Sequence, residues 1–208
     1  MFGLLLAFHI AGATVALLSG PIPMLSRKGG KLHRSAGDVF ATAMMLAAIA
    51  GFGLALIHWN VLLLGIAVLT FFLVFSGVRA IAFRRGARPA RFDDALCVLT
   101  MAFCTWLLWF GSRSSDISSL FFGVGGWGLA LRQWRLLRAL RTDWLSVHLV
   151  SMGGAYIATV SAFLVVNVSF IPQPILFIGP TLPGTPLIVW AGIRNRRDGT
   201  GAVAARQA

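Results

Sequence analysis

The chain has 208 residues, of which 58% are hydrophobic and 12% are charged. An ordinary soluble domain has about 25% charged residues and about 45–50% apolar ones, and a soluble fold of this length cannot hide so much apolar surface from water. The formal net charge is +12, but no basic stretch is long enough to form a nucleic-acid-binding domain. The composition therefore excludes a soluble protein and a nucleic-acid partner, and it indicates a protein whose main partner is the lipid bilayer.

Long apolar stretches recur along the chain, most of them close to the roughly 20 residues with which a helix crosses a bilayer. They predict an all-α, polytopic transmembrane helix bundle with a single membrane domain at residues 1–193. We expect seven spans, at about 2–24, 37–57, 61–83, 95–110, 117–131, 144–168 and 171–193, followed by a polar cytoplasmic tail at 194–208. The first stretch is interpreted as a span and not a signal peptide, because no Lys or Arg precedes Arg27.

Basic residues alternate between the predicted connections. Seventeen of the 18 Lys and Arg residues lie on every second connection or on the tail, and only Arg113 lies on the others. Because cytoplasmic loops carry an excess of Lys and Arg, we expect the N-terminus outside and the C-terminus inside, with the basic loops at anionic lipid headgroups. The alternation fails if one span is missing, so it favours seven spans although the fifth, at 117–131, is short and rich in glycine.

Small residues at four-residue spacing predict where helices touch. In lipid, close helix contact depends on small side chains and not on a hydrophobic force. The second span offers Ala47 and Gly51, and the sixth offers Gly154, Ala158 and Ala162. We interpret both stripes as helix contacts. Cys97 and Cys104, about 10 Å apart on one predicted helix, are too distant for a disulfide and are interpreted as packing residues.

Ionisable residues are rare within the predicted spans, where they are costly and mark functional sites. His9 lies in the first span and His148 in the sixth, while His33 and Asp38 flank the start of the second. Two interpretations of the histidines stay open. In the first, each ring bonds a neighbouring carbonyl or hydroxyl group and only pins two helices together. In the second, the histidines bind a cofactor.

The cofactor hypothesis rests on the expected depths of the histidines. His9 lies toward the outer side of the membrane, and His33 and His148 lie toward the inner side. Because haem iron takes an imidazole on each face, His9, His33 and His148 are candidate ligands of a b-type haem. A zinc, copper or iron site formed by His33, Asp38 and His148 is a further candidate, although no ligand-spacing motif supports it. Either cofactor makes the chain a redox, haem-binding or metal-binding membrane protein.

Two other functions compete with this hypothesis. Five prolines at 171–193 indicate a last helix broken around the binding site of a transporter or small-molecule binding protein, or a tolerated kink at the bundle edge. Alternatively, the chain is a structural or partner-binding membrane subunit. The sequence contains no motif of serine hydrolases, zinc proteases or phosphate-binding loops. Whether the protein is an enzyme of another kind stays open.

The string FHIAGATVALLSGPIPMLSRKGGKLHRSAGDVF resembles the opening of a family of bacterial multi-pass membrane proteins, a domain of unknown function. The likeness covers about residues 8–80 and 143–167. It consists of His9 in the first helix, Gly20 and Pro21 near its end, His33-Arg34-x-x-Gly37 opening the second helix, and a later histidine matched to His148. After His148 the sequence departs from the family pattern of basic residues and a tryptophan. The resemblance implies a protein of the bacterial cytoplasmic (inner) membrane with no assigned activity.

Overall fold

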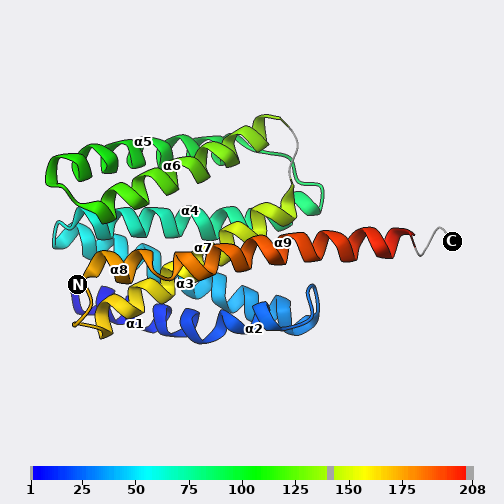
Figure 1. Cartoon of the computed structure of the whole chain (residues 1–208), viewed down its shortest axis with the longest axis horizontal. Helices are drawn as coiled ribbons and strands as arrows, with labels where there is room; N and C mark the ends of the chain where they lie inside the picture. The colour runs from blue at the N-terminus through cyan, green and yellow to red at the C-terminus, as the bar shows by residue number, and fades with distance from the viewer. Residues whose placement is uncertain (1, 140–142, 205–208) are drawn as a thin grey trace.

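The computed structural model describes the backbone of residues 2–139 and 143–204, with side chains described up to Arg194. These residues form an all-α bundle (Figure 1), as the composition predicts. Its long helices are α1 (Phe2–Ser19), α3 (Lys31–Ile57), α4 (Val61–Arg84), α5 (Arg91–Ser114), α6 (Ile117–Arg138), α7 (Trp144–Asn167) and α9 (Thr181–Ala204). Two short helices, α2 (Pro21–Leu25) and α8 (Gln173–Ile178), precede α3 and α9.

Six segments in the described part of the chain are long and apolar enough to cross a membrane. They are Phe2–Leu25, Lys31–Ile57, Val61–Arg84, Arg91–Ser114, Trp144–Asn167 and Gln173–Arg194. The multi-pass membrane class is thus confirmed. Helix α6 is not among the six, because its glycines and serines contribute little hydropathy and Arg132 and Arg135 lie within it. A seventh span at α6 therefore stays a prediction.

Helix α4 lies at the centre of the bundle, between α3, α5, α6 and α7 (Figure 1). Of its most apolar window, 61% is buried, compared with 17% for the segment that contains α1. The remaining apolar surface faces outward, with side chains such as Leu18, Leu99 and Val166 at 67–82% exposure. Burying such surface against hydrocarbon is favourable, so the exposed flanks match contact with a bilayer.

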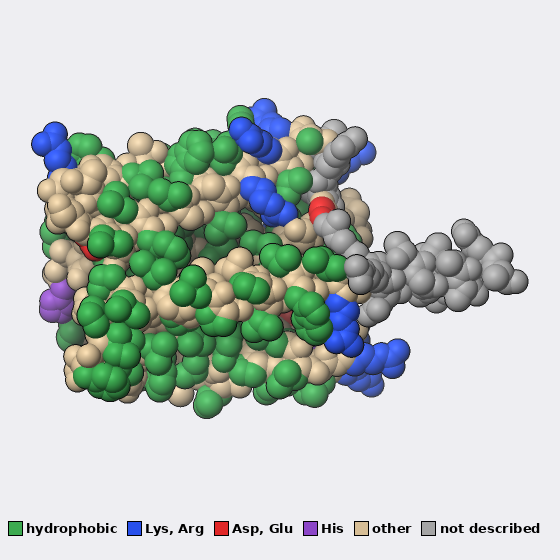
Figure 2. Space-filling view, in the orientation of Figure 1, with side chains coloured by type: hydrophobic (Ala, Val, Ile, Leu, Met, Phe, Trp, Pro, Cys, Tyr) green, Lys and Arg blue, Asp and Glu red, His purple; other side chains and the backbone are tan. Residues whose placement is uncertain are grey.

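Charged side chains gather at one end of the bundle. Figure 2 shows most Lys and Arg side chains toward the end from which the C-terminal helix projects, and hydrophobic side chains along the flank.

Two acidic residues cap the starts of helices. Asp116 accepts hydrogen bonds from the backbone of Ser118 and Ser119 at the start of α6, and Asp143 accepts one from Ser146 at the start of α7. Such caps satisfy backbone N–H groups that a helix start leaves open.

Helices α3, α5, α6 and α9 all extend beyond the predicted spans, and the extensions of α3 and α9 change the place of a candidate residue and of the predicted tail. Helix α3 begins at Lys31, six residues before the span expected at 37, so that His33 lies in its first turn. Helix α9 continues to Ala204, so much of the segment predicted as a polar tail is helical. Both extensions are polar. Hydropathy locates the apolar core of a helix but not the polar turns that continue it.

Candidate functional site: a cavity with a basic end and a histidine pair

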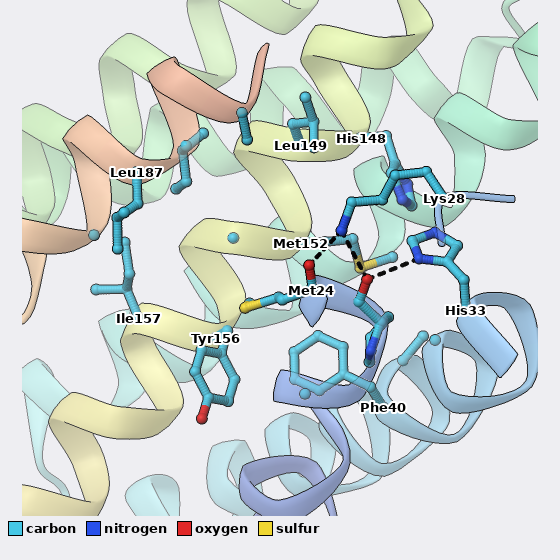
Figure 3. Close-up of a pocket in the computed structure, with 18 of the residues that line it drawn as sticks. Met24, Lys28, His33, Phe40, His148, Leu149, Met152, Tyr156, Ile157 and Leu187 are labelled. Carbon is cyan, nitrogen blue, oxygen red and sulfur yellow. Dashed lines mark hydrogen bonds between the residues drawn. The ribbon is translucent and has the colours of Figure 1, made fainter. Parts of the chain in front are cut away.

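A large cavity of about 2690 Å³ lies among α2, α3, α4, α7, α8 and α9 (Figure 3). Its walls are mainly apolar, with contributions from Phe40, Val78, Ile81, Leu149, Met152, Ile157, Val160, Leu164, Leu176, Pro183, Leu187 and Ile188. Protein interiors are packed closely, with few voids larger than a water molecule. A cavity of this size is therefore a place that another molecule can occupy.

One face of α7 lines the cavity along almost its whole length. The lining positions recur every three to four residues from Trp144 to Leu164, as expected for one side of a helix. About 20 residues at 1.5 Å each give about 30 Å, which is close to the hydrocarbon thickness of a bilayer. The cavity thus follows the depth of the membrane and does not form a small internal void.

Basic residues line the cavity at the end where the bundle carries most of its Lys and Arg. They are Lys28, Arg34, Arg84 and Arg85. The guanidinium carbon of Arg84 lies 4.8 Å from the centroid of the Trp144 ring, a cation–π contact. The Lys28 ammonium group donates hydrogen bonds to the carbonyls of Pro23, at 3.0 Å, and Met24. Burial lowers the pKa of Lys28 below that of an ordinary lysine.

The last helix forms one wall of the cavity, and it is broken as the prolines suggest. Helix α8 ends at Ile178, and α9 begins at Thr181 after Gly179 and Pro180. Contact between α9 and α7 depends on two glycines. A Cβ atom on Gly153 would lie 2.6 Å from Ile188, and one on Gly184 would lie 2.4 Å from Ile157. A larger side chain at either glycine would require the opposing isoleucine to shift or α9 to move away from α7.

Helix α8, by contrast, is fixed to α7 by a buried hydrogen bond. The hydroxyl of Ser161 donates to the backbone carbonyl of Phe177 at 3.0 Å. Both residues are at most 4% exposed. The two halves of the last span are therefore held to α7 in different ways, α8 by a hydrogen bond and α9 by packing.

His33 and His148 are brought together on one wall of the cavity, although they are far apart in sequence. Their ring centroids lie 6.5 Å apart with the planes inclined by 58°. His33 Nδ1 lies 2.9 Å from the carbonyl oxygen of Pro23, and His148 Nδ1 lies 3.0 Å from that of Gly77. Figure 3 shows both rings beside Lys28, whose ammonium group shares the Pro23 carbonyl.

His9 lies elsewhere in the bundle. Its Nδ1 atom is 2.9 Å from the carbonyl oxygen of Ala47. Ala47 follows His33 by 14 residues on the same helix, which corresponds to about 21 Å. The three histidines considered for haem binding thus do not form one site, because only His33 and His148 are adjacent.

Asp38 lines the cavity and is exposed, but it does not join the histidine pair. Among the side chains that the structure describes, at residues 2–139 and 143–194, no group of three or more His, Cys, Asp or Glu could hold a metal ion. The structure therefore leaves the predicted set of His33, Asp38 and His148 without the shared geometry that a three-ligand site requires.

Sequence reasoning missed the basic residues of the cavity. Lys28, Arg84 and Arg85 were interpreted as part of basic loops that set the membrane orientation and meet anionic lipid headgroups, and not as the lining of a cavity. It also missed the ion pair between Arg79 and Asp93, whose carboxylate side chain is only 4% exposed. A signal was present in the tryptophan at 144, which begins α7 next to a basic segment, because Arg commonly stacks on aromatic rings.

Comparison with known proteins gives no match to a family model, a curated protein or a solved structure. The resemblance carried by His9, His33 and His148 is therefore still a prediction.

Proposed function

We propose that this membrane protein binds an amphiphile with an anionic headgroup in the cavity. The observation that carries the proposal is the distribution of charge along the cavity. Lys28, Arg34, Arg84 and Arg85 line one end and outnumber the one acidic lining residue, Asp38, while most of the other lining side chains are apolar. An anionic headgroup at the basic end would allow the apolar part of the molecule to lie along α7.

The size of the ligand follows from the dimensions of the cavity. The lining of α7 extends over about 30 Å, from Trp144 to Leu164, which is enough for an extended acyl chain. Arg84 and Trp144 at the basic end combine a cation with an amphipathic ring, which is a common arrangement at the level of lipid headgroups. An anionic lipid and a water-soluble acidic amphiphile share this chemistry.

The proposal includes an orientation for the protein in a bacterial inner membrane. We place the basic end of the bundle in the cytoplasm and the N-terminus outside, with α6 as the seventh span. The support is the gathering of Lys and Arg at one end (Figure 2) and the positive-inside rule. Anionic lipids of the cytoplasmic leaflet would then lie next to the basic end of the cavity.

Orientation can be tested with single engineered cysteines and a membrane-impermeant maleimide on intact cells. Ser115 lies between α5 and α6, and Arg88 lies between α4 and α5; both are exposed. We expect Ser115→Cys to be labelled from outside and Arg88→Cys to be labelled only after the membrane is opened. The reverse result would overturn the proposed orientation.

Ligand binding is tested by native mass spectrometry of the protein purified in mild detergent. The probes are phosphatidylglycerol, phosphatidylcholine and a long-chain fatty acid, each added separately. We expect retention of an anionic probe in preference to phosphatidylcholine, and loss of this preference in the double variant Lys28→Gln, Arg34→Gln. Preference for phosphatidylglycerol alone would indicate a lipid, and preference for the fatty acid alone would indicate a smaller amphiphile.

The control is Arg113→Gln, which removes a basic residue in the last turn of α5, outside the cavity lining. It should leave the preference unchanged. Equal retention of anionic and zwitterionic probes by the wild-type protein would refute the proposed function. Loss of the preference in Arg113→Gln to the same degree as in the double variant would also refute it, because the effect would then reflect net charge.

A further inference from the structure

We infer that His33 and His148 form a site for a metal centre that accepts two imidazole ligands, either a metal ion or a haem iron. The inference rests on the backbone contacts of the two rings and on the distance between them. It can hold or fail separately from amphiphile binding, because it concerns the ring nitrogen atoms of His33 and His148 and not the charges of the neighbouring Lys28 and Arg34.

The backbone contacts determine which nitrogen of each ring can bind a metal. A carbonyl oxygen can only accept a hydrogen bond, so the 2.9 Å contact of His33 with Pro23 and the 3.0 Å contact of His148 with Gly77 place a hydrogen on each Nδ1. In the neutral imidazole, Nε2 then carries the lone pair. Among the described residues, neither Nε2 atom has a hydrogen-bond partner.

This arrangement is the one that metal-binding histidines usually have. A histidine ligand commonly donates its second N–H to a carbonyl or carboxylate, which fixes the tautomer and the direction of the ring. Here the two carbonyls come from different elements, Pro23 from α2 and Gly77 from α4. The ring orientations of His33 and His148 are thus set before any ligand binds.

The distance between the rings fits two imidazoles on opposite sides of one metal. Metal–nitrogen bonds are about 2.0–2.1 Å, and the ring centroid lies about 1.2 Å behind the nitrogen, so opposed ligands have centroids about 6.5 Å apart. The observed separation of His33 and His148 is 6.5 Å. Imidazole nitrogen suits zinc, copper and iron. Haem iron presents two open faces that take opposed ligands, whereas a tetrahedral zinc ion would draw the two rings closer together.

The adjacent cavity is large enough to hold more than a bare ion. Both histidines belong to its lining, as do Met152 and Phe40. An apolar wall suits the face of a macrocycle, and Lys28 and Arg34 at the same end suit its carboxylates. A bare ion and a haem would use the same two nitrogen atoms of His33 and His148. They differ because only the haem would also fill the adjacent cavity.

The test uses the full chain, purified in mild detergent and freed of metal by a chelator. One sample is titrated with haemin and followed by its visible spectrum; separate samples receive Cu²⁺ or Zn²⁺ and are dialysed before elemental analysis. We expect one metal centre per chain in one of these arms. Haemin should give a Soret band typical of two nitrogen ligands, whereas a bare ion should remain bound without a Soret change.

The variants are His33→Asn and His148→Asn. Asparagine retains an N–H group near the position of Nδ1, so each variant can keep its backbone hydrogen bond while it loses Nε2. His9→Asn is the matched control, because His9 makes the same kind of bond to Ala47 at a distance from the pair. Both pair variants should lose the bound metal, and the control should keep it.

Two results would overturn the inference. The first is that neither haemin nor either ion reaches one equivalent per chain in the wild-type protein. The second is that binding survives in both pair variants while size-exclusion chromatography shows them folded. Amphiphile retention is measured separately by mass spectrometry, so either proposal can fail while the other stands.

Discussion

Arg79 and Asp93 are joined by two parallel hydrogen bonds across the connection between α4 and α5. Arg79 Nε donates to Asp93 Oδ1 at 2.8 Å, and Nη2 donates to Oδ2 at 2.9 Å. Nη2 also donates to the carbonyl of Arg88 at 3.1 Å, and the backbone N–H of Ala90 donates to Asp93 at 2.8 Å. The pair therefore fixes the connection as well as neutralising a buried carboxylate.

Replacing Asp93 should destabilise the protein strongly. Asp93→Asn leaves the guanidinium of Arg79 without its charged partner, and breaking a buried pair on one side costs about 3–5 kcal/mol. Because the side chain of Arg79 is 25% exposed, we expect a loss near the lower limit. The free energy of unfolding in mixed detergent micelles provides the measurement.

The neighbouring residue Asp94 supplies the control for that prediction. It pairs with Arg138 at 3.2 Å, but the two side chains are 33% and 63% exposed. Pairs of this kind contribute about 0–1 kcal/mol, so Asp94→Asn should change stability little. Equal losses from the two substitutions would show that the burial of the pair does not matter.

Helix α1 should not tolerate a side chain at Gly12. A Cβ atom there would lie 2.8 Å from the carbonyl oxygen of Ala43, and a backbone atom cannot move aside as a flexible side chain can. We expect Gly12→Ala to cost about 1–3 kcal/mol, measured by thermal unfolding. Gly3→Ala on the same helix meets nothing within 4 Å and should be neutral or slightly stabilising.

Binding of an anionic amphiphile should weaken as the pH rises, and it should do so at a lower pH than a lysine with an ordinary pKa would cause. Burial lowers the pKa of Lys28, so its positive charge is lost as the pH rises through a value below about 10.4. The affinity should therefore be full at neutral pH and fall on the alkaline side. Lys28→Arg should extend binding to higher pH, since arginine stays protonated. An identical pH profile for both proteins would exclude Lys28 as the responsible group.

The two native cysteines should be inert in the folded protein. Cys97 is 1% exposed and Cys104 is fully buried, and both thiols are free. A maleimide should leave the wild-type protein unlabelled in mild detergent and label both positions after denaturation in dodecyl sulfate. Labelling under native conditions at the rate of Ser115→Cys would contradict the burial of these residues.

Local sequence patterns predicted that one face of α3 contacts another helix, but they did not identify α1 as the partner. The stripe of Ala47 and Gly51 was expected to be a helix contact, and the prediction is confirmed. Ala47 lies against Gly12, and a Cβ atom on Gly51 would lie 3.1 Å from the His9 ring. Small residues reveal such contacts because their spacing is a property of one helix, and the partner helix need not be known.

The pairing of His33 with His148 had no comparable signal. It depends on how α3 and α7 are rotated about their axes and on the carbonyls of Pro23 and Gly77, which belong to two further elements. The cavity was also hidden, because it results from the way several helices fail to fill the space between them. Hydropathy identifies the stretch of each helix that lies within the bilayer, but it does not report how helices are rotated or where they leave space between them.

The break at Gly179 and Pro180 lies between α8 and α9, and α9 forms one wall of the cavity. If the angle at the break changes, each residue of α9 moves in proportion to its distance from the break. Helix α8 is tied to α7 by Ser161, so a change of angle at the break would leave α8 in place. Arg194 lies about 20 Å along α9, and a swing of about 10° would carry it roughly 3–4 Å. The basic end of the cavity would thus change its width most, while the width of the opposite end would stay nearly constant.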